Sequence, residues 1–141
     1  MKQLFNPFPY PRAADFWLLA LRMLTSWFMI FGHGLPKWNR FTSGAEIQFA
    51  DPFGLGPSAS MVLAIFAEIG CSALIIIGLV TRWAVVPLII TMLVAAFYAN
   101  AGQPFGKKEL ALVYLLLYCT LFIFGSGKYS LDHVIFNRLK K

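Results

Sequence analysis

Four apolar segments of about 20 residues each occupy more than half of this chain. A helix of that length crosses the hydrocarbon core of a bilayer, and only 13% of the residues are charged. A chain of 141 residues is too small to hide so many apolar side chains inside a water-soluble domain. The segments therefore exclude a soluble enzyme and a disordered chain, and they predict a membrane protein.

The predicted fold is all-α, with four transmembrane helices in one polytopic bundle and residues 1–141 forming a single membrane domain. Backbone groups in lipid must find partners within their own segment, which favours helices. The ~10-residue alternation of a transmembrane β-barrel is missing. Pro36 is expected to end the first helix, because proline disfavours helical geometry in the residue before it. The helices are placed at residues 16–35, 60–80, 83–100 and 109–127.

The lysine and arginine positions predict how the bundle is oriented. An even number of spans puts both termini on one side, which we expect to be cytoplasmic because it carries more basic residues. That side holds Lys2, Arg12, Arg82, Lys128, Arg138, Lys140 and Lys141, and the other side holds Lys37, Arg40, Lys107 and Lys108. Residues 130–141 predict an amphipathic helix on the cytoplasmic leaflet, with Ser130 as its N-cap.

Four ionisable residues lie in or beside the predicted spans, namely Arg22, His33, Glu68 and Glu109. A charge at the bilayer centre costs about 2.5–3.5 kcal/mol, so each should face protein and find a partner. The expected depths of Arg22 and Glu68 allow an intramembrane ion pair between them. Such residues have two interpretations: they form a polar network that fixes helix pairing, or they form a functional site.

A polar group is predicted to converge in the outer half of the bundle. Helical spacing keeps Arg22, His33 and then Lys37 on one face of the first helix. A pocket of this kind can bind a small polar headgroup or relay protons. The candidate residues for binding are His33, Lys37, Glu68, Glu109 and Tyr98.

Other kinds of site have little support in the sequence. The net charge is +6, but the basic residues form no stripe, so no nucleic-acid partner is expected. No zinc-type spacing, phosphate loop or Ser–His–Asp set occurs, so no metal site or catalytic residue is assigned. Cys71 and Cys119 lie in apolar segments and are read either as small buried residues or as a redox pair.

Four blocks in chain order resemble the DoxX family of small four-helix membrane proteins. They are HGLPK (33–37), AEIGCSALIIIGLVTR (67–82), GQPFGKKELA (102–111) and GSGKYSLD (125–132). The resemblance implies a multi-pass protein of the bacterial cytoplasmic membrane. The family is named for its similarity to a membrane subunit of a thiosulfate:quinone oxidoreductase. The most family-like positions are Arg22, His33, Gly34, Lys37, Glu68, Glu109 and Asp132.

The first functional hypothesis is a quinone-interacting subunit that works with a partner oxidoreductase. Lys37 or His33 would donate to a quinone oxygen, and Glu68 or Glu109 would relay protons. The alternative is a non-catalytic anchor or assembly partner, and a third reading is a small transporter that would need to dimerise. No cofactor is assigned beyond the expected quinone. The sequence does not decide whether the protein forms a homo-oligomer or whether the chain is itself catalytic. The expected partners are the bilayer and a membrane or redox protein.

Overall fold

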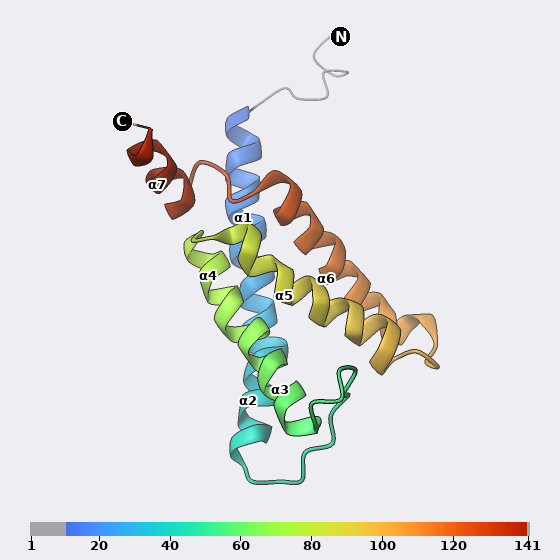
Figure 1. Ribbon diagram of the computed structural model, residues 1–141. Helices are drawn as coiled ribbons and strands as arrows, with labels where there is room; N and C mark the ends of the chain where they lie inside the picture. Colours follow the sequence, from blue (N-terminus) through green and yellow to red (C-terminus); the bar gives the residue numbers. More distant parts are fainter. Residues whose placement is uncertain (1–10, 141) are drawn as a thin grey trace.

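The computed structural model describes residues 11–140, and every regular element in that range is a helix, which confirms the all-α prediction there. The helices form four rods (Figure 1). Rod 1 comprises α1 (Pro11–Met29), the π-helical segment η2 (Ile30–Gly34) and α2 (Leu35–Thr42). Rod 2 comprises α3 (Pro57–Ile65), η3 (Phe66–Cys71) and α4 (Ser72–Ile77). Rod 3 is α5 (Thr81–Leu93) with η4 (Val94–Ala99), rod 4 is α6 (Phe105–Phe124), and α7 (Leu131–Leu139) follows.

Rods 1 to 3 are long and apolar enough to cross a membrane. Rod 4 also has the length of a span, with 20 residues, but Lys107, Lys108 and Glu109 stand near its beginning. It packs along α5 as an antiparallel neighbour, and this pair leans away from rods 1 and 2 toward the end that holds residues 43–56 (Figure 1). The structure thus shows a membrane protein with three clear spans and a fourth rod packed beside them.

Rod 1 continues past Pro36, so the predicted end of this helix at Leu35 is wrong. Proline lacks an N–H, and its ring clashes with the carbonyl four residues earlier in a regular α-helix. Here η2 immediately precedes it, and the Leu35 N–H donates to the Ile30 carbonyl across a wider turn. A π-helical turn inserted in this way accommodates the proline without ending the helix. Lys37 therefore lies on a helix and not in a loop.

The interior of the bundle differs from its outer face. Large side chains such as Trp17, Phe28 and Leu116 point outward, as they do in a protein whose solvent is lipid. Fewer hydrophobic residues are buried than are exposed, and the buried core includes Met29, Cys71, Ile75, Leu88, Tyr118 and Leu121. Polar side chains are buried among these residues, which concentrates the chemistry of the chain on the inner faces of the rods.

The connection at residues 43–56 is held by hydrogen bonds. The Asp51 carboxylate accepts the Ser60 hydroxyl at 2.7 Å and the Gly56 N–H at 2.8 Å, and these bonds lower the pKa of Asp51, with the Ser60 bond as the main cause. The Tyr98 hydroxyl donates to the Asp51 carbonyl at 3.2 Å. The connection is therefore attached both to α3 and to the end of rod 3.

Rods 1 and 2 lie close together at Gly34. A Cβ atom added there would lie 2.6 Å from the Ile69 Cγ1 atom and 3.4 Å from the Glu68 Cβ atom. Gly32, in the same π-helical segment, has no such neighbour within 4 Å. The absence of a side chain at Gly34 is thus what lets the two backbones meet.

We predict that Gly34→Ala lowers the unfolding free energy by about 1–3 kcal/mol, because the added methyl group overpacks the contact with Ile69. The measurement is SDS-induced unfolding in mixed micelles, followed by circular dichroism. Gly32→Ala is the matched control and should change little. Equal effects of the two substitutions would show that the close approach does not matter for stability.

Candidate functional site

An ion pair with a buried carboxylate joins rods 1 and 2 next to their contact at Gly34. The Lys37 ammonium Nζ atom lies 2.8 Å from the Glu68 Oε1 atom and 2.7 Å from the Oε2 atom, so it donates to both carboxylate oxygens. Glu68 is 2% exposed and Lys37 is 24% exposed. The carboxylate therefore sits inside the bundle, whereas the lysine connects it with the outside.

A row of aromatic side chains leads from the Lys37–Glu68 pair into the bundle. The half-buried His33 ring meets the Tyr114 ring edge-on, with centroids 5.6 Å apart, and the Tyr118 ring stacks 6.1 Å beyond Tyr114. Ser72 lies beside Tyr118. Sequence reasoning missed both tyrosines. Their spacing of one helical turn within an apolar segment was the available signal, because a tyrosine hydroxyl in lipid needs a polar neighbour.

Two of the five candidate binding residues lie apart from this group. Tyr98 is exposed and its hydroxyl bonds to the 43–56 connection, and Glu109 is exposed near the start of α6. The structure places His33 and Lys37 one turn apart on rod 1 and pairs Lys37 with Glu68. The candidate site is thus His33, Lys37 and Glu68, joined by tyrosines that the sequence did not indicate.

Arg22 does not form the predicted ion pair with Glu68. Its guanidinium donates from Nη1 to the Ser126 carbonyl at 3.2 Å and from Nη2 to the Tyr129 carbonyl at 2.6 Å. Side chains on a helix point back toward its N-terminus, so Arg22 reaches away from Glu68. Glu68 instead takes Lys37, which lies near the opposite end of the rod. Similar depth in the membrane was not enough to predict which charged residues on two helices form an ion pair.

The Arg22 guanidinium belongs to a structural network that binds the segment after α6. It lies against Gly78, where any side chain would collide with it. The Asp132 carboxylate accepts the backbone N–H groups of Val80 at 2.6 Å and Thr81 at 3.0 Å, which caps the start of α5. Ser130 accepts an N–H of α7 as its N-cap, as predicted. Arg22 itself is 1% exposed.

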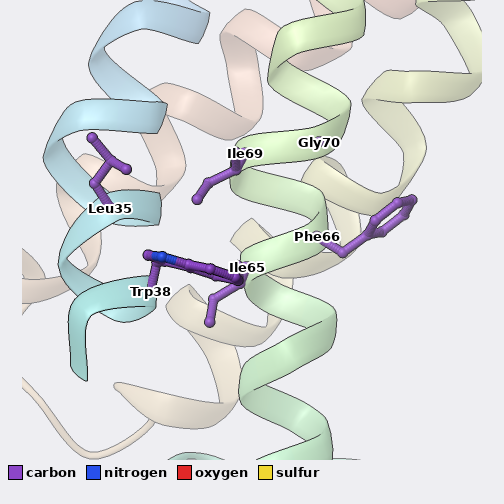
Figure 2. Close-up of a pocket in the computed structure, with 6 residues that line it drawn as sticks. All are labelled: Leu35, Trp38, Ile65, Phe66, Ile69 and Gly70. Carbon is purple, nitrogen blue, oxygen red and sulfur yellow. The ribbon is translucent and has the colours of Figure 1, made fainter. Parts of the chain in front are cut away.

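Two apolar grooves run along the outside of the bundle. One, of about 360 Å³, separates α2 from rod 2, with the Trp38 ring lying toward Ile65 and Phe66 pointing away from it (Figure 2). The other, of about 320 Å³, separates α1 from α6. Its lining is apolar except for Thr25 and Tyr114, and it includes Trp17, Leu21, Leu24, Phe28, Leu110, Val113 and Leu117. Only the second groove therefore reaches the residues of the candidate site.

Within residues 11–140, no group of three or more His, Cys, Asp or Glu side chains could hold a metal ion. Cys71 is buried and Cys119 is half-buried, and both are free thiols. The chemistry of the described site is therefore that of an ion pair, an imidazole and phenol hydroxyls, all of which can donate or accept protons.

Comparison with known proteins shows the family of the chain. The family model of DoxX matches residues 17–101, which include most of rod 1, all of rods 2 and 3, and the Lys37–Glu68 pair. The chain belongs to the DoxX family. This DoxX protein is similar to two proteins of Haemophilus influenzae strain Rd, both described as uncharacterized. One is 34% identical over 125 residues, covering 84% of this chain and 82% of the relative. The other is 31% identical over 133 residues, covering 87% and 93%. No solved structure matches it.

We predict that Lys37→Met in this DoxX protein lowers the unfolding free energy by about 3–5 kcal/mol, because it leaves the buried Glu68 carboxylate without a partner. Adding Glu68→Gln to that variant should restore part of the loss. SDS unfolding of the single and double variants measures this coupling. Lys107→Met, at an exposed lysine, is the control. A Lys37→Met loss no larger than the control would contradict a buried pair.

We also predict that Asp132→Ala accelerates hydrogen exchange at the Val80 and Thr81 amides by roughly tenfold, because losing such a cap costs about 1–2 kcal/mol. Hydrogen–deuterium exchange with mass spectrometry measures the amides of this turn. Asn137→Ala is the control, since the Asn137 amide contacts only His133 on its own helix. Unchanged exchange at the turn would show that Asp132 does not hold it.

Proposed function

We propose that this DoxX-family protein is a quinone-interacting subunit of the bacterial cytoplasmic membrane and works with a partner oxidoreductase. The observation that carries the proposal is the groove between α1 and α6, which is apolar along its length and contains Tyr114. A quinone needs an apolar slot for its isoprenoid chain and a few hydrogen-bond donors for its carbonyl oxygens. The Tyr114 hydroxyl and the neighbouring His33 ring are donors of that kind.

The ion pair gives the proposed site access to protons. Reduction of a quinone to a quinol takes up two protons with two electrons, and in this proposal the partner supplies the electrons. Lys37 is partly exposed and holds the buried Glu68 carboxylate, so the pair can pass protons from the outside toward His33. This assignment keeps His33, Lys37 and Glu68 as site residues and adds Tyr114 to them.

The topology that fits this role has four spans and cytoplasmic termini. The 20 residues of α6 are about 30 Å long, which is enough to cross the hydrocarbon core beside α5. Its charged residues at positions 107–109 then lie at the outer surface. In that orientation α7 lies on the inner leaflet, with Lys140 toward the headgroups and an exposed apolar side that includes Leu131, Val134 and Ile135.

A non-catalytic anchor or assembly partner is the second candidate, and one observation favours it. Phe53 and Leu55 are 61% and 58% exposed in the 43–56 connection. This connection is tied to the bundle by Asp51, so it presents these side chains as a fixed surface that a partner protein could cover. A small transporter, the third reading, has no such observation in its favour.

The test is the quinone content of the protein purified in mild detergent, measured by extraction and mass spectrometry. We expect close to one quinone per chain. Tyr114→Phe should weaken binding by about fivefold, because a hydrogen bond contributes about 1 kcal/mol. Leu117→Trp, which fills the groove between α1 and α6, should abolish it.

Leu35→Trp is the matched control, because it fills the other apolar groove and should leave the quinone content unchanged. All variants are compared by thermal melting to verify folding. A folded wild-type sample with no quinone above the level of bulk membrane lipid would contradict the proposal and favour the anchor. Equal losses from Leu117→Trp and Leu35→Trp would contradict the assignment to the α1–α6 groove.

A further inference from the structure

The turn between rods 2 and 3 holds a strained residue. Within the described chain, Val80 is the one non-glycine residue with a positive φ, at φ 45° and ψ 39°. A β-branched residue adopts this left-handed conformation only where its surroundings enforce it. The Asp132 N–H donates to the Gly78 carbonyl at 2.8 Å, and the Asp132 carboxylate accepts the N–H groups of Val80 and Thr81. Three hydrogen bonds thus tie the conformation of this turn to the position of α7.

The rest of α7 has little contact with the bundle. It lies at the end of the bundle where α4 ends and α5 begins, and within residues 11–140 no other helix packs closely along it (Figure 1). None of its nine residues is buried. A helix this short is only marginally stable in water on its own, because most helical stability comes from the packing of an amphipathic face. A surface that covers α7 is therefore expected.

The exposed side chains of α7 show what kind of surface this is. Helical spacing places Leu131, Val134 and Ile135 on one face, and these side chains are between 44% and 46% exposed. Leu139, one turn after Ile135, is 82% exposed. The uncovered face of α7 is thus apolar along its length.

The residue that follows the turn indicates the level of α7 in the membrane. Trp83 is 78% exposed, and tryptophan side chains gather at the interface between lipid and water. The neighbouring Arg82 is also exposed, as expected at a membrane surface. The start of α7, which is bonded to this turn, therefore lies at the height of the lipid headgroups.

The charged side chains of α7 fit an anionic surface. Arg138 continues the apolar face at its C-terminal end, and the Lys140 ammonium lies 4.6 Å from the centre of the Phe136 ring. Both basic residues are exposed, and neither belongs to the two ion pairs of the described residues. Long basic side chains can lay their stems along lipid and carry their charge to the headgroups. The carboxylate of Asp132, the acid of this helix, is already bound to the turn.

We propose that α7 binds the headgroups of anionic phospholipids, and that this binding holds the turn between rods 2 and 3 in its strained conformation. The apolar face of α7 lies among the acyl chains, and Arg138 and Lys140 bind phosphates. Each basic residue near an anionic surface strengthens binding about fivefold, and salt screens the attraction. Asp132 transmits the docking of α7 to Val80. This binding rests on the leaflet placement of α7 in the proposed topology and requires no quinone.

Hydrogen–deuterium exchange with mass spectrometry tests the proposal on the full chain, with one copy in each nanodisc. The bilayer is either phosphatidylcholine alone or phosphatidylcholine mixed with anionic phosphatidylglycerol. We expect the amides of α7, Val80 and Thr81 to exchange at least about fivefold more slowly in the anionic bilayer. High salt should remove the difference. Equal exchange in the two bilayers would overturn the proposal, and this comparison needs no variant.

Two double variants separate the charges of α7 from the charge of the whole protein. Arg138→Gln, Lys140→Gln should abolish the dependence of α7 exchange on lipid charge. Arg40→Gln, Lys107→Gln is the matched control, because it removes the same charge from two exposed residues outside α7 and should keep that dependence. The same response in both double variants would overturn the assignment of the lipid site to α7.

Asp132→Asn tests the link between α7 and the turn, because it keeps the size of the side chain but removes its charge. The amides of α7 should still respond to lipid charge, whereas those of Val80 and Thr81 should not. A wild-type response of the turn in this variant would contradict the role of Asp132. Protection of α7 only in discs with two copies, whatever the lipid, would assign its apolar face to a second copy of the chain. Quinone content is measured separately, so each proposal can fail alone.

Discussion

The contact between rods 1 and 2 at Gly34 is the constraint on which the rest of the bundle depends. Because this residue has no side chain, η2 packs against rod 2 so tightly that an added Cβ atom would lie 3.4 Å from the Glu68 Cβ atom. That approach brings Lys37 onto the carboxylate and sets the antiparallel register of the two rods. The register in turn places the Arg22 guanidinium at Gly78, where it binds the segment that follows α6. One small residue thus helps to position both buried charges, Glu68 on rod 2 and Arg22 on rod 1.

The two buried charges, Glu68 and Arg22, are stabilised by different kinds of partner at the two ends of the bundle. At one end a lysine neutralises a carboxylate and donates hydrogen bonds to both of its oxygens. At the other end a guanidinium is held by two backbone carbonyls. The first arrangement is suited to moving protons, whereas the second fixes chain geometry. This difference is the reason to seek chemistry near Glu68 and structure near Arg22.

The all-α fold could be predicted from the sequence because lipid imposes it: apolar segments of this length have few other structures available. The error at Pro36 arose because proline was judged against a regular α-helix, whereas the preceding turn is π-helical. The Arg22–Glu68 error arose because depth says nothing about the direction in which a long side chain points. His33, Lys37 and Glu68 could be predicted as candidate residues because they are ionisable side chains in or beside apolar segments. The tyrosines of the site depend on how α6 rotates against rod 1, which no local pattern in the sequence reveals.

The position of Arg22 bears on the side of the membrane from which the proposed reaction takes its protons. A fixed cation repels hydronium, much as arginines do in water-selective pores. Protons for the proposed chemistry would then arrive from the Lys37 face and not from the end of the bundle that holds Arg22. If a partner delivers electrons from that same face, electrons and protons arrive together and no net charge crosses the bilayer. Such a reaction would be electroneutral, and the transmembrane voltage would neither drive it nor oppose it.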